Sequence, residues 1–382
     1  FSENDYRNPS NSKVISALQE LMCDKDFCTL YSLFMLALAR KELSACSFRL
    51  FIGEKPNITP VMNEDLSTET TKEELNEAFI DEWGVKYSKD GRKLLGVSEK
   101  LSGAYSVKEG TRIICDRAFD WCCSLSNIVI PDSVASIGKE AFLYCVLLKS
   151  ISIPKSVICL NGNPFVDWDG KLECLSPDFI YEDDVLFNEN KSKIISFRNK
   201  NIELYAIPDS VISIGDRAFS GCRSLSCIVI PNSVTSIEDR AFSGCRSLSS
   251  IVIPDSVTNI EEGAFSGCRS LSSIVVPNSV TSIEKGAFYY CSSLSSIVIP
   301  SSVTSIGDTT FANCHSLSSI VIPDSVTSIG KCAFFRCRSL SEIVIPSSVT
   351  SIGDRAFYKC KFPDNLKQEL ISRFGDKIFS SR

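Results

Sequence analysis

A 23-residue period runs through most of this 382-residue chain. Proline, phenylalanine and cysteine each recur at this interval, and the repeating unit can be written CxSLxxIxIPxSVxxIxxxAFxxC. A unit of this length cannot bury its own apolar side chains, but identical units stacked on one another form a continuous core. The period therefore predicts a repeat solenoid in which equivalent side chains form columns. The regular prolines are Pro208, Pro231, Pro254, Pro277, Pro300, Pro323 and Pro346.

Each unit contains one alternating apolar run, such as Leu248 to Ile253, which is typical of a half-buried strand. Pro254 ends the run, because proline cannot donate a hydrogen bond to a neighbouring strand. A second short apolar step, Val257 to Ile260, precedes Phe265 and the next cysteine. We therefore expect each unit to form one rung with a strand on one face.

This unit resembles that of the BspA-like (treponemal-type) leucine-rich repeat proteins over roughly 101–167 and 201–360, since repeat length, proline position, SVxxI and AFxxC all agree. Ser256 stands where the general leucine-rich consensus has Asn or Cys, which favours this subclass over the ribonuclease-inhibitor type. The resemblance implies a leucine-rich repeat solenoid. It also implies a non-enzymatic binding scaffold, often adhesive and often on a bacterial surface.

A second periodicity has an offset of 100. Residues 84–131 align without gaps on 184–231, so that GVKYSKDGRKLLGV meets DVLFNENKSKIISF. Each block reads as a β-hairpin, turning at Asp90-Gly91 and near Asn190-Lys191, that leads into a run of rungs. Because 100 is not a multiple of 23, we expect a duplicated module with two β-hairpin inserts, the second lying within the array.

Both ends of the chain predict helical caps. Residues 12–43 read as two amphipathic helices, and Thr70 with Glu73 forms a capping box for a helix that ends at Gly84. At the other end, Asp364 to Phe374 reads as a helix ended by Gly375. The predicted domains are a helical N-terminal cap or small domain (1–83), a hairpin with the first repeats (84–167), an irregular join with the second hairpin (168–207), seven regular repeats (208–360) and a C-terminal capping helix (361–382).

The recurring cysteine suggests a metal ladder, a disulfide ladder or a column of buried thiols. Zinc sites need converging local pairs, whereas no CxxC occurs and His315 is the only histidine, so we expect no metal. Equivalent side chains on rungs about 4.8 Å apart lie parallel, which does not suit a disulfide with Cβ atoms about 3.8 Å apart. Free cysteine behaves as a small buried hydrophobe. The sequence therefore favours a structural thiol ladder of Cys222, Cys245, Cys268, Cys291, Cys314, Cys337 and Cys360.

Other candidates for chemistry lie outside this ladder. Cys227 and Cys332 occupy positions expected to be exposed, where a reactive thiol is the alternative to a passive one. His315 occupies the column of surface arginines. The acidic groups at Asp167–Asp169 and Glu182–Asp184 suit either calcium binding or a solvated loop. Since no nucleotide-binding, hydrolase or metalloprotease motif occurs, we predict no cofactor and no enzyme activity.

The strand face is the predicted ligand-binding surface. Val252, between the inward-facing Ile251 and Ile253, should point outward, and its column continues on every rung. An exposed apolar stripe with a serine margin is typical of a recognition surface, although valine pairs can also only stabilise the sheet. The predicted site comprises Val229, Val252, Val275, Val298, Val321, Val344, Ser250, Ser273, Ser296 and Ser319.

Composition limits the partners. The net charge of −6 and the pI of about 5.2 provide no basis for nucleic-acid binding. The longest apolar stretch, residues 27–39, is too short to span a bilayer, which takes about 20 residues. The chain begins at Phe1 rather than Met, which is consistent with removal of a signal peptide.

We therefore predict a non-catalytic protein–protein interaction or adhesion scaffold, whose strand face binds a protein such as a host or extracellular-matrix ligand. Family resemblance places it at the cell surface or outside the cell. The alternative is a cytoplasmic scaffold whose partner docks on residues 1–83, because many unpaired thiols suit a reducing compartment.

Overall fold

The computed structural model describes residues 65–98 and 101–380. The chain divides into two units, residues 1–64 and residues 65–382. The predicted helices within 12–43 and the apolar stretch 27–39 lie outside the described residues. Among the described helices, none is long and apolar enough to cross a membrane.

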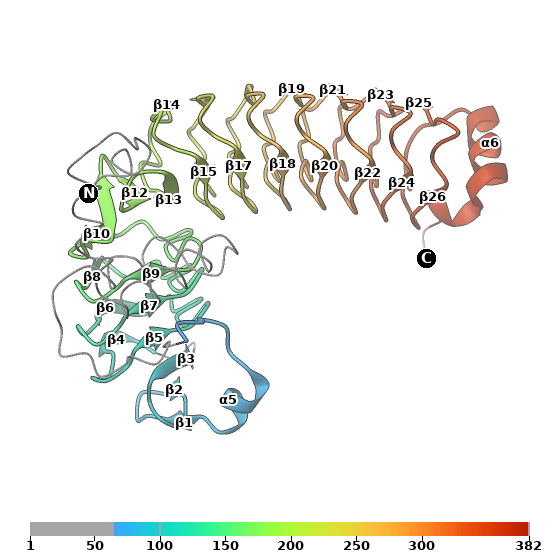
Figure 1. The fold of residues 1–382 in the computed structure, drawn as a ribbon. Helices are drawn as coiled ribbons and strands as arrows, with labels where there is room; N and C mark the ends of the chain where they lie inside the picture. Colours follow the sequence, from blue (N-terminus) through green and yellow to red (C-terminus); the bar gives the residue numbers. More distant parts are fainter. Residues whose placement is uncertain (1–64, 99–100, 381–382) are drawn as a thin grey trace, which may run out of the picture. The chain divides into compact units, whose positions relative to one another are not determined.

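The predicted repeat solenoid is confirmed, and its longest sheet is formed by the second apolar step of each rung (Figure 1). Strands in that sheet are mostly two residues long and pair in parallel between rungs, so that Ile237 meets Ile260 and Ile260 meets Ile283. The ten strands, in spatial order, are β11 (Phe179–Glu182), β12 (Val185–Asn188), β13 (Lys193–Phe197), β15 (Ser213–Ile214), β17 (Ser236–Ile237), β18 (Asn259–Ile260), β20 (Ser282–Ile283), β22 (Ser305–Ile306), β24 (Ser328–Ile329) and β26 (Ser351–Ile352). We call residues 178–380 the second stack.

Residues 65–177, the first stack, contain a shorter sheet of the same kind. Its strands, in spatial order, are β1 (Phe79–Ile80), β2 (Val85–Tyr87), β3 (Lys93–Val97), β5 (Ile113–Ile114), β7 (Ser136–Ile137) and β9 (Cys159–Leu160). The two stacks have separate hydrophobic cores.

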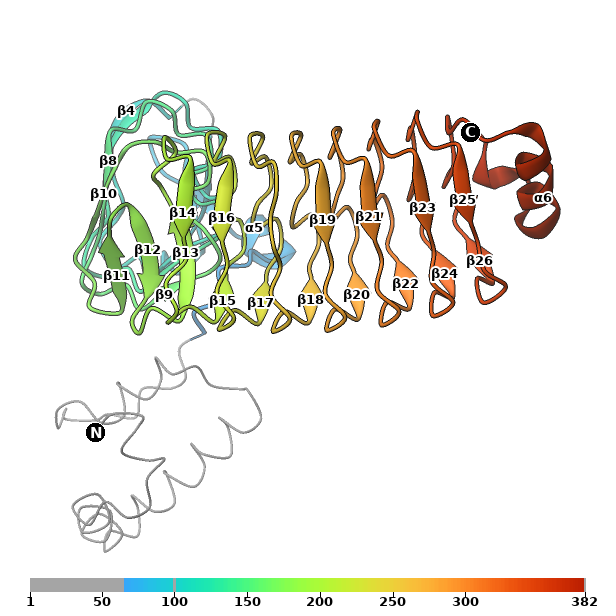
Figure 2. The ribbon, with the colours of Figure 1, turned by 90° about the horizontal axis from the view of Figure 1, so that it is seen from above.

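The first apolar step of each rung forms a second row of strands (Figure 2). These strands are shorter than predicted: the equivalent of the expected run Leu248 to Ile253 pairs over only three residues in β19, and Val252 makes only an isolated bridge to Val275. The chain turns sharply before and after this step, which leaves only its centre straight enough to pair. The strands are β4 (Gly103–Ser106), β6 (Leu125–Val129), β8 (Ser150–Ile153), β10 (Lys171–Cys174), β14 (Leu204–Ala206), β16 (Cys227–Val229), β19 (Ser273–Val275), β21 (Ser296–Val298), β23 (Ser319–Val321) and β25 (Glu342–Val344).

Each stack begins with a three-stranded antiparallel meander, β1-β2-β3 in the first and β11-β12-β13 in the second. The offset of 100 holds even for irregularities, because the register shifts between Lys86 and Tyr87 in β2 and between Leu186 and Phe187 in β12. Both meanders therefore share one backbone design.

The second meander is buried on both faces. Val185 and Phe187 pack in the core of the second stack, whereas Leu186 and Ile195 pack in the core of the first stack. Alternate residues of a strand point to opposite faces. One face of the pair β12 and β13 therefore packs in the core of the first stack, and the opposite face packs in the core of the second stack. In the first meander, by contrast, Lys86 occupies the position of Leu186 and is exposed.

The predicted helix over residues 70–84 is wrong in length, because the observed helix is shorter at both ends. Helix α5 (Lys72–Asn76) is capped by Thr71 rather than Thr70, and the capping box pairs Thr71 with Glu74. The expected apolar face ends early because Phe79 lies in β1, paired with Tyr87 of β2. Pairing with a neighbouring strand outweighs the weak stability of a short isolated helix.

The C-terminal capping helix is confirmed. Helix α6 (Asp364–Phe374) ends at Gly375, whose φ of 82° is left-handed, and is followed by the 3₁₀-helix η1 (Asp376–Ile378). Leu370 and Ile378 are buried in the core of the second stack. These residues cover the apolar columns that the last rung would otherwise expose.

Phenylalanine forms the central column of the core. From Phe219 to Phe357 the rings of successive rungs stack with centroids 5.2–5.6 Å apart. Backbone hydrogen bonds between rungs fix this spacing, such as the 2.8 Å bond that the Phe242 N–H donates to the Ala264 carbonyl. The stack is thus held by its backbone as well as by apolar burial.

Candidate functional site

The predicted strand face exposes its valines. Their exposed fractions range from 53% for Val229 to 77% for Val252, while Ile251 and Ile253 on either side of Val252 are 5% exposed. The four margin serines are also exposed. Parallel pairing aligns Val275 with Val298 and Val321 with Val344, so the valines form a column along the stack. The face is an apolar line between polar side chains, held on a backbone that the core keeps rigid.

A shallow open depression lies at the start of this column. It has a volume of about 730 Å³ and includes Val229, Ile207 and Ile230 with the polar Asp209 and Asn232 on its wall. The depression joins the second stack's first two rungs, where the valine column begins. It places a hollow at one end of the valine column.

The cysteine ladder is buried. All seven thiols are free and at most 9% exposed. Each thiol from Cys245 to Cys360 donates to the carbonyl of the phenylalanine 26 residues earlier, as Cys245 Sγ does to Phe219 O at 3.1 Å. Burial raises the pKa of Cys222, Cys268 and Cys337 to about 12, since a thiolate loses its hydration there. These thiols act as hydrogen-bonding core residues rather than as nucleophiles.

Cys227 and Cys332, which were expected to be exposed, are half-buried. Cys227 lies in β16, and Cys332 adopts a left-handed φ of 56° before the core Phe334. Desolvation raises the pKa of Cys332, which lowers its reactivity. His315 Nδ1 lies 3.1 Å from the Arg336 carbonyl oxygen.

The acidic candidates do not converge. Asp169 pairs with Lys200 at 2.6 Å, and Glu182 pairs with Lys191 at 2.5 Å. Trp168, between the two aspartates, is buried and donates to the Leu148 carbonyl at 2.7 Å. Within the described residues, no group of three or more His, Cys, Asp or Glu side chains is placed to hold a metal ion.

A column of serines performs a task that sequence reasoning missed. In several SVxxI units the serine hydroxyl donates to the valine carbonyl of the preceding rung, as Ser279 does to Val257 and Ser325 to Val303, both at 2.6 Å, whereas the hydroxyls of Ser233 and Ser348 have no hydrogen-bond partner within the described residues. Ser256 belongs to this column. Ser256 stands where the general leucine-rich consensus has Asn or Cys, and this could have indicated its role, because a polar side chain at that position hydrogen-bonds to backbone groups between rungs.

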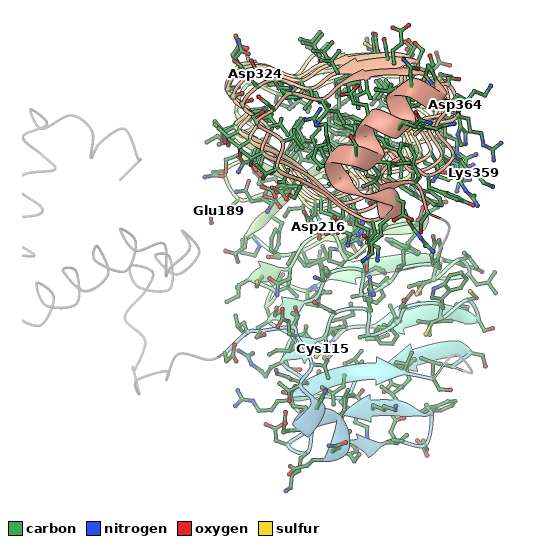
Figure 3. All side chains as sticks on the ribbon, turned by 90° about the vertical axis from the view of Figure 1, so that its right-hand side faces the viewer. Cys115, Glu189, Asp216, Asp324, Lys359 and Asp364 are labelled. Carbon is green, nitrogen blue, oxygen red and sulfur yellow. The ribbon has the colours of Figure 1, made fainter. Side chains whose placement is uncertain are left out.

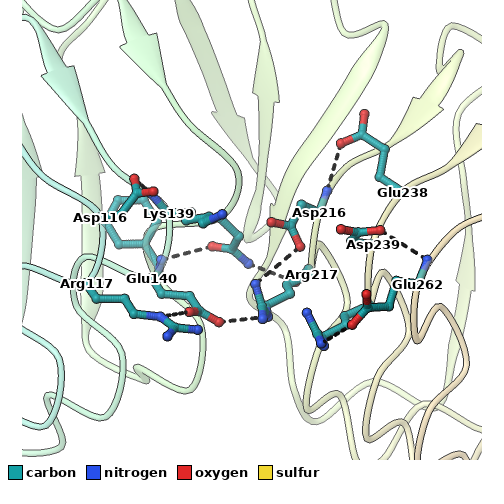
Figure 4. Close-up of polar contacts among 12 residues, drawn as sticks. Asp116, Arg117, Lys139, Glu140, Asp216, Arg217, Glu238, Asp239 and Glu262 are labelled. Carbon is teal, nitrogen blue, oxygen red and sulfur yellow. Dashed lines mark hydrogen bonds and ion pairs between the residues drawn. The ribbon is translucent and has the colours of Figure 1, made fainter. Parts of the chain in front are cut away.

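A charged contact between the stacks was also missed. The carboxylate of Glu140, in the first stack, accepts from Arg117 of the same stack and from Arg217 of the second stack at 2.8 Å (Figure 4). Asn163 adds a 3.0 Å bond from its amide to the Arg217 carbonyl. Arg117 and Arg217 are equivalent residues of the duplicated module, so one buried glutamate binds both copies.

Comparison with known families identifies the repeat. The model described as "BspA type Leucine rich repeat region" matches six copies over residues 107–177, 193–318 and 304–382. Comparison with curated proteins finds no match.

Two solved bacterial structures are similar to this chain. A leucine rich cell surface protein from Faecalibacterium prausnitzii is 31% identical with a TM-score of 0.52, covering 61% of this chain and 60% of its own. A leucine-rich repeat protein from Eubacterium ventriosum is 24% identical with a TM-score of 0.57, covering 70% of this chain and 84% of its own. The chain thus spans 60% of the length of the Faecalibacterium protein, and the Eubacterium structure shares the fold.

Proposed function

Because the chain belongs to the BspA-type leucine-rich repeat family, we propose that it is a non-catalytic scaffold that binds a protein ligand along its strand face. The observation that carries the proposal is the valine column. Six valines at least half exposed stand in register on a rigid stack, and a soluble surface rarely keeps such an apolar line without a partner.

The face suits an extended protein surface better than a small molecule. It repeats the same valine and serine on successive rungs, and the depression at its start is shallow and open. Small-molecule sites are concave and enclose most of their ligand. A long, uniform line instead matches a partner that lies along several rungs, such as an extracellular-matrix protein.

The proposed location is the cell surface or the extracellular space. The Faecalibacterium relative is described as a cell surface protein, and a surface scaffold would meet matrix or host proteins there.

Charge placed on the valine column tests the proposal. We expect the chain to bind a member of a panel of purified matrix proteins, and Val252→Glu with Val275→Glu and Val298→Glu to weaken that binding at least about tenfold, since a carboxylate in an apolar interface must be desolvated. Surface plasmon resonance measures the affinity, and circular dichroism checks the fold.

The matched control places the same charges on the same three rungs: Thr258→Glu with Thr281→Glu and Thr304→Glu, at exposed β-branched residues outside the strand face. This variant should retain binding. If both folded variants bind as tightly as the unchanged chain, the strand face is not the site.

The alternative site for a protein partner has one observation in its favour. Residues 65–83 expose Leu75, Ile80 and Trp83, the last two by 60% and 56%. The equivalent of Ile80 in the second meander, Ile180, instead packs against a core. If the strand-face variant binds normally, Ile80→Ser with Trp83→Ser is the next variant to examine.

A further inference from the structure

We propose that a second surface, the turn edge of the second stack, binds a linear sulfated polysaccharide. The turn edge comprises the residues between the core phenylalanine and the next core leucine of each rung, from Ser220 to Lys361. It is separate from the valine column, and the proposal does not depend on the proposed function.

Charge is segregated on this edge. The turn edge carries cations and no carboxylate, although the net charge of the chain is −6. Viewed along the stack in Figure 3, Lys359 lies on the side away from Asp324 and Glu189. The cations are Arg223, Arg246, Arg269, Arg336, Arg338, Lys359 and Lys361, and all seven are exposed.

These cations are available to a ligand. Within the described residues, no carboxylate lies within 4.0 Å of their charged nitrogens. Arginines elsewhere on the rungs behave differently: Arg217 pairs with Glu140 at 2.8 Å and Arg240 pairs with Glu262 at 2.6 Å. The turn edge is therefore where positive charge is left uncompensated.

Aromatic rings hold several of the cations in place. Arg269 lies over the Tyr290 ring at 5.6 Å, Arg336 over Phe335 at 5.1 Å and Lys359 over Tyr358 at 5.4 Å. A cation over a ring face is stabilised by the ring's negative potential. The contact with a ring thus restricts the motion of each of these charged side chains before a ligand binds, which reduces the conformational entropy lost on binding.

Arg223, Arg246 and Arg269 occupy the same position on three successive rungs, and Arg338 and Lys361 occupy it on the last two, with Ser292 and His315 on the two rungs between. The Ser270 N–H donates to the Arg246 carbonyl and the Ser293 N–H to the Arg269 carbonyl, both at 3.1 Å, so successive turns are tied together. The resulting line of charges matches a linear polyanion rather than a compact one. Exposed serines follow several of the cations, such as Ser247 after Arg246 and Ser339 after Arg338, and supply hydroxyls for hydrogen bonds to sugar hydroxyls.

The surroundings distinguish a polysaccharide from other polyanions. Single-stranded nucleic acid needs free ring faces on which bases stack, but here cations cover the faces of Tyr290, Phe335 and Tyr358. An acidic protein would use several buried apolar anchors, whereas the large apolar side chains exposed on the turn edge are limited to Tyr289 and Tyr290, at 38% and 36%. Sulfates and hydroxyls on one extended chain match this set.

Backbone geometry shows that two of these cations stand at strained positions. Two residues after the core phenylalanine, the chain is left-handed: Gly244 and Gly267 have φ of 73°, yet Tyr290, Arg336 and Lys359 adopt φ of 60–64°. A Cβ at either glycine would meet only ordinary contacts at 3.6–3.8 Å, so glycine is preferred there for its backbone alone. Tyr290, Arg336 and Lys359 therefore keep large side chains at a cost in backbone strain.

The test uses residues 1–382 with immobilised heparin as the probe. We expect binding that weakens as salt rises, and Arg336→Gly with Lys359→Gly to reduce the affinity at least about tenfold while lowering the slope of log affinity against log salt by about 1.5, the share of two contacts. Glycine suits the backbone at both positions, so this variant should remain folded.

The matched control is Arg240→Gly with Arg355→Gly. It removes the same charge from residues that are also left-handed, with φ of 51° and 60°, but that lie outside the turn edge. This control should keep its affinity for heparin, as should the strand-face valine variant.

Three outcomes would overturn the proposal. They are no binding to heparin at low salt, equal loss in the two glycine variants, or tighter binding to polyuridylate or polyglutamate than to heparin. The second outcome would indicate only diffuse charge, and the third a nucleic acid or an acidic protein as the ligand.

Discussion

Each rung has two residues with a left-handed backbone, one before and one after the core alanine and phenylalanine. Before them stand Arg240 and Gly263, and after them stand Gly244 and Arg336. The 23-residue period shows which residues share a column, but it contains no information on φ, so these positions could not be predicted. Glycine recurring in the AFSGC turns was the only sequence signal.

Arg336→Gly should raise the free energy of unfolding by roughly 0.5–1 kcal/mol, because relief of the left-handed strain exceeds the loss of the exposed contact with Phe335. Urea denaturation measures the change. Arg240→Gly is the comparison, and it should gain less because its bond to Glu262 is lost. A less stable Arg336→Gly variant would contradict this account of the turn.

At the scale of elements, the columns of the core were predictable and the strands were less so. Spacing alone placed phenylalanine and cysteine inside, since a 23-residue unit has few other ways to bury them. Strand length depends on where the backbone straightens, and on that point the expected run Leu248 to Ile253 was too long. The hydrogen bond from Cys245 to Phe219 also joins rungs in a way that one unit cannot reveal.

The cysteine column should make the second stack sensitive to alkali. An unfolded thiol has a pKa of about 8.5, whereas burial raises the pKa of Cys222, Cys268 and Cys337 to about 12. Above about pH 8.5 the unfolded chain loses protons that the folded chain keeps. Each such thiol therefore lowers the free energy of unfolding by about 1.4 kcal/mol per pH unit up to its folded pKa.

Urea denaturation across this pH range measures the slope. Cys245→Ala with Cys268→Ala should be less stable at neutral pH but should show a shallower decline with pH, because two thiols no longer titrate. A free energy of unfolding that stays constant between about pH 8 and pH 10 would contradict the prediction.

At the scale of the whole described unit, two stacks are joined by a meander and by Glu140. The offset of 100 predicted the duplicated start, and the alternation in DVLFNENKSKIISF carries the second apolar face at Leu186 and Ile195. The contact of Glu140 with Arg117 and Arg217 was not predictable, because neither the 23-residue period nor the duplication specifies where one stack meets the other.

Glu140→Ala should lower the free energy of unfolding by about 3 kcal/mol, since it leaves the partly buried Arg217 with only its longer 3.4 Å contact to Asp216. We expect calorimetry to resolve two thermal transitions, one for each core. Glu262→Ala is the control: its pair with Arg240 is more exposed and lies within one stack, so the loss should stay below about 1 kcal/mol. A single transition at the original temperature in Glu140→Ala would show that the meander alone couples the stacks.

The two-sided meander has a consequence for how such chains can grow. The meander β1-β2-β3 exposes Lys86. The meander β11-β12-β13, which lies between the two cores, carries the buried Leu186 at the equivalent position. Converting a meander of the first kind into one that lies between two cores thus takes few substitutions on one face, and the shared register shift leaves the backbone unchanged. Tandem duplication of a gene segment of about this size can therefore concatenate whole arrays, each with its own rungs and its own surface columns.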